Sequence, residues 1–165
     1  MTGNSIETTA PALLPAGDLP VGQGIDCGSY EVTEDEIVGF ASSWDPLYFH
    51  VDPHQAVHSD FGGLIASGLH TASIYQRLAV TGLFSRYDVI AGKEIHGMRF
   101  LRPVRPGDVL SCSILIQSVE PDRAGRSLVK MLGTLRNQHS KPVLERGVDS
   151  IMRSIEAPGP DQRSV

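Results

Sequence analysis

Hydrophobic residues along the chain follow first the period of a helix and then that of strands. From residue 68 to about residue 84, apolar side chains cover most of a helical circumference, which predicts a long helix buried on more than one side. Further on, apolar residues recur at every second position, the pattern of half-buried strands. The strands expected there cover residues 95–101, 109–119, 128–136 and 143–154.

The segment before the long helix predicts one strand and two short helices. The strand is expected at residues 25–32, and Thr33-Glu34-Asp35-Glu36 then forms a capping box that starts a helix over residues 34 to about 44. Pro46 disfavours helical geometry at Asp45, and Asp52-Pro53 offers a second helix start. His50 is therefore expected on the link between two short helices.

This order of elements predicts an α+β domain in which an antiparallel meander wraps one long helix. We expect a single domain over residues 23–156, with a flexible lead-in at 1–22 and a frayed tail at 157–165. A sheet of this kind leaves an edge strand and part of the helix exposed, and two copies can cover both by pairing. A homodimer or a dimer of dimers is the expected assembly.

Composition narrows the class of function. The 165 residues carry a formal charge of -5, without the basic stripe of a nucleic-acid-binding protein. No apolar run approaches the roughly 20 residues of a membrane span, so neither nucleic acid nor membrane is an expected partner. The two cysteines lack C-x-x-C spacing and do not resemble a disulfide framework, which makes the cytoplasm the default compartment.

An acid, an imidazole and a helix start lie close together in the chain. Asp45 precedes His50 by five residues, and Gly68 follows Ser67 at the start of the long helix. This combination suits acid–base chemistry beside a carbonyl whose oxygen gains negative charge. Each residue also has a structural alternative, because Asp45 can cap a turn, His50 can be a satisfied buried histidine and Gly68 can serve packing alone.

A metal site is the less favoured interpretation of the neighbouring histidines. His54 and His58 are four residues apart, a spacing that metal ligands use on helices. The segment lacks an established third ligand and begins with the capping Asp52-Pro53 pair, so we interpret it as solvated helix surface. The expected site contains no metal and no redox cofactor.

Three motifs in order resemble the MaoC-like dehydratases, which are relatives of the (R)-specific enoyl-CoA hydratases. They are residues 45–52, residues 61–68 (Phe-Gly-Gly-Leu-Ile-Ala-Ser-Gly) and residues 99–108 (Arg-Phe-Leu-Arg-Pro-Val-Arg-Pro-Gly-Asp). The resemblance extends from about residue 30 to residue 154. It implies the hot-dog fold, an antiparallel sheet wrapped around a long central helix.

The resemblance also implies roles for single residues. Asp45 and His50 would be the acid–base pair and the Gly68 amide the oxyanion donor, with Ser67 and Gly63 beside the substrate. We align the motif on the histidine, which puts Asp45 at the catalytic position; alignment on the proline would put it at the family's asparagine. Ser67 stands where relatives often have a histidine.

The reaction implied is reversible hydration of trans-2-enoyl-CoA to (R)-3-hydroxyacyl-CoA. An acyl-CoA or acyl-carrier-protein thioester would be the partner, and coenzyme A would enter only as part of the substrate. Two alternatives stay open, a hot-dog acyl-CoA thioesterase and a non-catalytic acyl-thioester-binding or partner subunit of a heteromeric dehydratase. Arg99, Arg102 and Arg105 are candidates for contacts with coenzyme A phosphates, although solvated strand ends explain them equally well.

Overall fold

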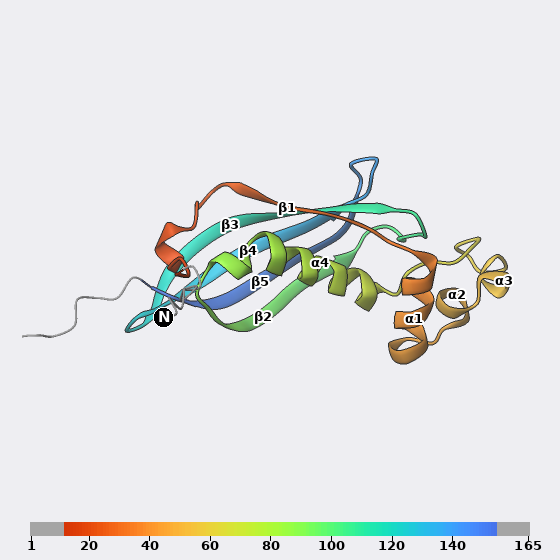
Figure 1. The fold of residues 1–165 in the computed structure, drawn as a ribbon, viewed down its shortest axis with the longest axis horizontal. Coiled ribbons are helices and arrows are strands. Elements are labelled where there is room, and N and C mark those ends of the chain that lie inside the picture. The colour runs from red at the N-terminus through yellow and green to blue at the C-terminus, as the bar shows by residue number, and fades with distance from the viewer. Residues whose placement is uncertain (1–11, 155–165) are drawn as a thin grey trace, which may run out of the picture.

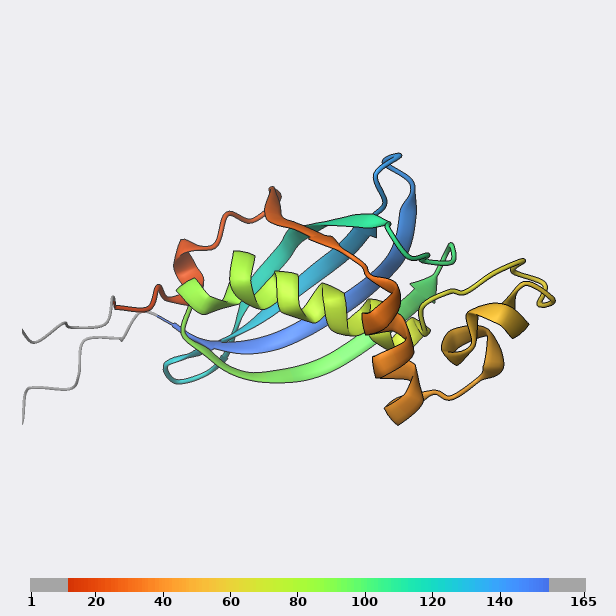
Figure 2. The same cartoon turned by 45° about the vertical axis from the view of Figure 1, so that its right-hand side comes forward.

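The computed structural model describes residues 12–154, in which a five-stranded antiparallel sheet curves around one long helix (Figure 1). Helix α4 (Gly68–Gly82) lies along the concave side of this sheet, as Figure 2 shows. The α+β architecture predicted from the sequence is confirmed. The strands are β1 (Gly24–Glu31), β2 (Val89–Phe100), β3 (Val109–Arg123), β4 (Arg126–Arg136) and β5 (Pro142–Arg153).

The strands lie side by side in the order β1-β3-β4-β5-β2. Strands β3, β4 and β5 form the expected meander, but β2 pairs with β5 and not with β3. The meander predicted for all four downstream strands is therefore wrong for β2. The physical reason is the connection over residues 101–108, which is too long for a tight hairpin and carries the chain from one edge of the sheet to β3 near the other.

The core lies between α4 and the inner face of the sheet. Alternate residues of β3 are fully buried there and pack with the sheet-facing side of α4, where Tyr75 and Ala79 are also fully buried. Strand β2 begins at Val89, six residues before the predicted start at 95. Its first residues are mostly exposed because β2 is an edge strand, so they lack the alternation that predicts a strand.

Part of the predicted flexible lead-in is packed onto the domain. Leu14 forms a bridge with Tyr87, and the short 3-10 helix η1 (Ala16–Asp18) buries Ala16, followed by the buried Leu19. These apolar side chains explain why residues 12–22 differ from the expectation for 1–22. Residues 1–11 and the predicted tail at 157–165 lie outside the described residues. Within residues 12–154, no helix has both the length and the apolar character needed to cross a membrane.

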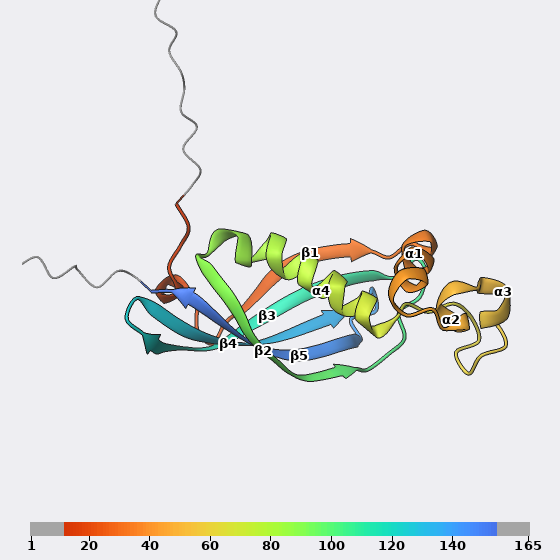
Figure 3. The same cartoon turned by 90° about the horizontal axis from the view of Figure 1, so that it is seen from below.

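Three short helices lie beyond one end of the sheet, beside the N-terminus of α4 (Figure 3). Helix α1 (Glu34–Trp44) begins with the predicted capping box, in which Thr33 and Glu36 each accept a hydrogen bond from the other's backbone N–H. Helix α3 (Pro53–Ala56) is capped by Asp52 as predicted. His50 lies within α2 (Tyr48–Val51), a single helical turn, and not on a bare link as expected.

Candidate active site

The fold brings Asp45 and His50 together at the N-terminus of α4. Asp45 caps the C-terminus of α1, where its N–H donates to the Ala41 carbonyl, and the chain then turns into α2. The His50 side chain is 7% exposed, and its Nε2 lies 3.6 Å from Oδ2 of Asp45. This separation is longer than a hydrogen bond and allows one water molecule to contact both atoms.

The other ring nitrogen of His50 fixes its tautomer. Nδ1 lies 2.7 Å from the Ile65 carbonyl oxygen, which can only accept a hydrogen bond, so Nδ1 carries the proton. In the neutral tautomer that this bond selects, Nε2 is the nitrogen with the lone pair, and it faces Asp45. The Phe49 ring packs edge-on against the imidazole, with 4.5 Å between the two ring centroids, and restricts the rotation of the imidazole. This imidazole is held ready to accept a proton at Nε2.

Ser67 connects the acid to the start of α4. Its hydroxyl donates to Oδ2 of Asp45 at 2.6 Å and accepts a hydrogen bond from the Leu69 N–H at 3.2 Å. Ser67 itself is fully buried, whereas the Asp45 side chain that it holds is 29% exposed. Ser67 therefore caps the helix and orients the carboxylate.

Gly68 is the first residue of α4, so its N–H has no partner within the helix. The Ser67 cap engages the N–H of Leu69, and none of the residues 12–154 accepts a hydrogen bond from the N–H of Gly68. A Cβ atom at Gly68 would lie 2.9 Å from the Phe100 ring, so a larger residue requires the ring to move. The start of α4 thus offers an N–H and the positive end of the helix dipole to an oxygen that gains charge.

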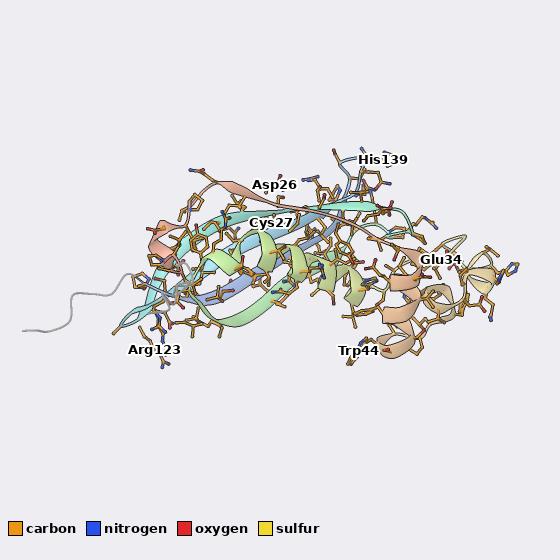
Figure 4. The ribbon with its side chains drawn as sticks, viewed as in Figure 1. Asp26, Cys27, Glu34, Trp44, Arg123 and His139 are labelled. Carbon is orange, nitrogen blue, oxygen red and sulfur yellow. The ribbon has the colours of Figure 1, made fainter. Side chains whose placement is uncertain are left out.

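A cavity of about 430 Å³ opens beside these groups. Its wall includes His50, Gly68 and Thr71. Asp45 is not part of the wall and lies behind it, in contact with His50 and Ser67. Trp44, the last residue of α1, is 72% exposed at the surface (Figure 4). The rest of the wall is mostly apolar and consists of Phe49, Phe61, Ile65, Ala66, Phe100, Leu101, Arg102, Pro103 and Val104.

Gly63 and two of the three candidate arginines do not border the cavity. Gly63 lies near the Arg105 guanidinium, where a Cβ atom would be 3.4 Å from Nη1, and Arg105 donates to the Phe61 carbonyl. Arg99 forms an ion pair with Glu145 at 2.6 Å. Arg102 does border the cavity, and its Nη1 donates to the Pro142 carbonyl. The substrate-binding role of Gly63 stays a prediction.

Sequence reasoning missed three groups of this site. The Ile65 carbonyl that orients His50 carries no side-chain signal, and Thr71 reads as an ordinary helix residue. Phe100 belongs to a motif that the sequence analysis singled out, but its contact with Gly68 joins segments that are distant in the chain. His70 is a second buried histidine near the site. Its ring stacks on that of Phe40, with 4.8 Å between the ring centroids, and does not border the cavity.

Comparison with known proteins places this architecture in a family. The MaoC-like domain matches residues 19–138. The chain is 34% identical over 128 residues to the uncharacterized protein YdeM of Bacillus subtilis, covering 78% of this chain and 91% of YdeM. It is 30% identical over 94 residues to a 3-hydroxybutyryl-CoA dehydratase of Methylorubrum extorquens, covering 56% of this chain and 58% of that enzyme.

A solved structure shows the same arrangement. The MaoC-like dehydratase from Rhodospirillum rubrum matches with a TM-score of 0.78 and 32% identity, over 87% of this chain and 99% of that one. The sheet that wraps α4 is therefore a hot-dog fold, as the sequence motifs predicted. With the family match over residues 19–138 and the similarity to YdeM along most of both chains, the protein belongs to the MaoC-like domain family.

Proposed function

We propose that the protein is a hydro-lyase that reversibly hydrates a trans-2-enoyl-CoA to an (R)-3-hydroxyacyl-CoA. The observation that carries this proposal is the pairing of an oriented imidazole with a carboxylate beside a cavity that reaches the N-terminus of α4. Similarity to a dehydratase named for 3-hydroxybutyryl-CoA supports an acyl thioester as substrate. The (R) configuration follows the resemblance to the (R)-specific hydratases.

In the proposed mechanism one water molecule binds between Asp45 and His50. Nε2 of His50 takes a proton from this water as its oxygen adds to C3 of the enoyl group. Asp45, held by the Ser67 hydroxyl, orients the water, and the proton that Nε2 has taken is returned to C2 with Asp45 sharing in the transfer, so that His50 and Asp45 end in their starting states. The water oxygen reaches C3 and the proton reaches C2 from the same side of the double bond, so the addition is syn. Dehydration follows the same path in reverse.

The thioester oxygen gains negative charge when C3 is attacked. We place this oxygen against the N–H of Gly68, where a preorganised donor and the helix dipole stabilise the charge. Removal of one such donor typically lowers turnover by about 10² to 10³. The apolar wall that includes Phe49, Phe61 and Phe100 suits the acyl chain, and Arg102 suits a polar part of the thioester.

The test is hydration of crotonyl-CoA and of a medium-chain trans-2-enoyl-CoA, followed by the loss of conjugated absorbance and by chiral analysis of the product. Formation of the (R) product by wild type, and its loss in Asp45→Asn, supports the proposal. His58→Gln is a matched control because His58 is exposed. A folded protein that binds the thioester but does not hydrate it contradicts the proposal, and release of free thiol from a saturated acyl-CoA identifies a thioesterase instead.

A further inference from the structure

Two cysteines that are far apart in the sequence oppose each other across strands β1 and β3. The pairing of these strands contains a bulge, where Cys27 and Gly28 of β1 stand opposite the single residue Cys112 of β3. Gly28 takes the extra position with a φ of +87°. Both cysteines are free thiols, and Cys27 is 4% and Cys112 2% exposed. Figure 4 shows Cys27 on β1, at the edge of the sheet.

Both thiols lie on the inner face of the sheet. Cys112 belongs to the alternating row of buried residues on β3. A Cβ atom at Gly82 of α4 would lie 2.7 Å from the Cβ of Cys27, so Cys27 also faces the helix. The Cys27 thiol donates to the Ile25 carbonyl at 3.8 Å, which leaves its sulfur lone pairs free to accept from Cys112.

The spacing of an antiparallel pair suits a disulfide between these residues. The Cα atoms of facing residues lie about 4.5 to 5.5 Å apart in such a pair. A disulfide joins Cα atoms that are roughly 4.4 to 6.8 Å apart. The bulge keeps Cys27 opposite Cys112, so the two sulfurs can form a bond with little movement of either strand.

The surroundings make Cys27 the more reactive thiol of the two. The neighbouring Cys112 thiol, as a hydrogen-bond donor, lowers the pKa of Cys27, and Arg86 lowers it further, whereas burial and the charge of Asp26 oppose the shift. The same hydrogen bond, together with burial, raises the pKa of Cys112. Because the thiolate is the nucleophile, Cys27 is the sulfur better suited to attack an oxidant.

A small oxidant can approach the pair from the β1 edge. Among the described strands β1 pairs with β3 alone, and a Cβ atom built on Gly28 would meet no atom within 4 Å. An edge strand with a bulge also opens locally more easily than a central strand. This edge lies at the opposite end of the sheet from β2, and the contact between the two cysteines is internal to one chain.

We propose that hydrogen peroxide converts Cys27 and Cys112 into a disulfide that links β1 to β3. The Cys27 thiolate attacks one peroxide oxygen and becomes a sulfenic acid, and the other oxygen leaves as hydroxide, which takes up the proton that Cys27 released. The Cys112 sulfur then displaces the sulfenic hydroxyl, which leaves as water with the Cys112 proton. The two sulfurs together lose two electrons, and the peroxide gains them as it becomes two water molecules.

This disulfide closes a loop that contains helices α1 to α4 and strand β2, and therefore the whole candidate site. A cross-link over a long loop stabilises a protein mainly by restricting its unfolded chain. The oxidised protein should consequently unfold at a temperature about 5 °C or more above that of the reduced protein. The proposal does not depend on the hydration reaction.

The first test uses the natural chain. Reduced protein is treated with excess hydrogen peroxide, quenched with catalase, denatured, blocked with N-ethylmaleimide and analysed by mass spectrometry. We expect a single chain that has lost two hydrogen atoms and carries no maleimide, and a cross-linked peptide pair that contains Cys27 and Cys112. Dithiothreitol should restore both thiols and reverse the rise in unfolding temperature.

The second test compares Cys112→Ala with Cys27→Ala, which are matched because each keeps one thiol of the pair. Dimedone, which traps sulfenic acids, should label Cys27 in the first variant at least about tenfold faster than Cys112 in the second. Peroxide should raise the unfolding temperature of neither variant. Equal labelling rates would overturn the assignment of Cys27 as the attacking sulfur.

Three results with the wild type overturn the proposal as a whole. They are two thiols that still react with maleimide after the peroxide treatment, a disulfide that joins two chains on a non-reducing gel, and sulfinic acid on either cysteine without a cross-link. Peptide mapping of the wild type separates these results from the expected disulfide. It decides the question even if a cysteine variant does not fold.

Discussion

The carbonyl of Ile65 and the hydroxyl of Ser67 set the chemistry of His50 and Asp45 through single hydrogen bonds. The carbonyl fixes the proton on Nδ1 and leaves Nε2 free, while the hydroxyl donates to the carboxylate oxygen nearest that nitrogen. Neither group needs to touch the substrate. The properties of the pair therefore depend on backbone and cap positions as well as on the two side chains.

Replacement of either member of the pair should abolish most of the activity without unfolding the protein. For Asp45→Asn and His50→Gln, we expect turnover of enoyl-CoA to fall by about 10² to 10⁴, the usual contribution of a general acid or base. Asparagine keeps an oxygen for the Ser67 hydroxyl, so thermal unfolding should stay close to that of the wild type. A nearly fully active Asp45→Asn would favour the alignment on Pro46 and place the acid elsewhere.

Ser67→Ala should affect stability and turnover together, because one hydroxyl makes both bonds. Loss of the N-cap should lower the free energy of unfolding by about 1 kcal/mol, and the freed carboxylate should lower kcat more than it changes KM. Urea unfolding and steady-state kinetics measure the two effects. Ser73→Ala is the control, since Ser73 is exposed and bonds only to the Leu69 carbonyl within the helix. An effect on stability alone would leave Ser67 as a cap and nothing more.

The positions of Asp45, His50 and Gly68 in the sequence were sufficient to predict that these three residues lie close together. They were insufficient to predict the contact between Phe100 and Gly68, which depends on how β2 meets α4. The sequence analysis also missed that Arg146 of β5 is buried, for a different reason. A charged residue in a strand is normally interpreted as facing solvent, and only the register of β5 reveals that it faces the helix.

At the scale of elements, α4 carries a histidine whose protonation opposes folding. Burial lowers the pKa of His70, and the nearby negative charge of Glu36 opposes this shift only in part. The unfolded chain therefore binds a proton at this residue at higher pH than the folded one. Stability from the neutral imidazole is complete above the ordinary histidine pKa of about 6.5 and is lost as the pH falls toward the lower folded-state value.

His70→Gln should accordingly reduce the loss of unfolding free energy between pH 7 and pH 5. Urea unfolding of both proteins at the two pH values measures this difference. His139→Gln is the control, because His139 lies in an exposed turn between β4 and β5 (Figure 4). Identical pH dependence of the wild type and His70→Gln would show that this residue makes no contribution to the acid sensitivity of the fold.

The accuracy of the predicted elements followed the burial of each one. The capping box at Thr33 and the half-buried alternation of β3 gave correct helix and strand starts, because local hydrogen bonds and one buried face both leave a pattern in the sequence. The start of β2 was predicted six residues too far along the chain, because a strand exposed on both faces lacks the alternation of apolar and polar residues. Its pairing with β5 could not be predicted, because partner choice at a sheet edge is a property of the whole topology.

At the scale of the whole molecule, the edge strand and the outer side of α4 expose large apolar side chains. Ile95 on β2 is 53% exposed and Leu69 on α4 is 55% exposed in the single chain. An unpaired strand edge with such residues favours association with a second copy. We expect sedimentation velocity to show at least a dimer at micromolar concentration.

Ile95→Lys should shift this equilibrium toward the monomer by about tenfold or more, because a charge on an edge strand opposes pairing. Val57→Lys is a matched control, because Val57 is a similarly exposed apolar residue at the C-terminus of α3 and does not belong to β2 or α4. Sedimentation of the wild type as a monomer at all concentrations would contradict the expected assembly. Equal effects of the two lysine substitutions would place the interface away from β2.

The hydroxyl of Ser67 has a consequence for attempts to change what the protein accepts. Ser67, which caps α4, also holds the acid, and Tyr75 of the same helix packs against Gly133 of β4. A substitution that shifts α4 should therefore alter catalytic geometry and packing at once. Such substitutions should show strong epistasis. Phe100 of β2 borders the cavity beside His50, and β2 bonds to neither member of the pair, so laboratory evolution of chain-length preference should progress faster through β2 than through α4.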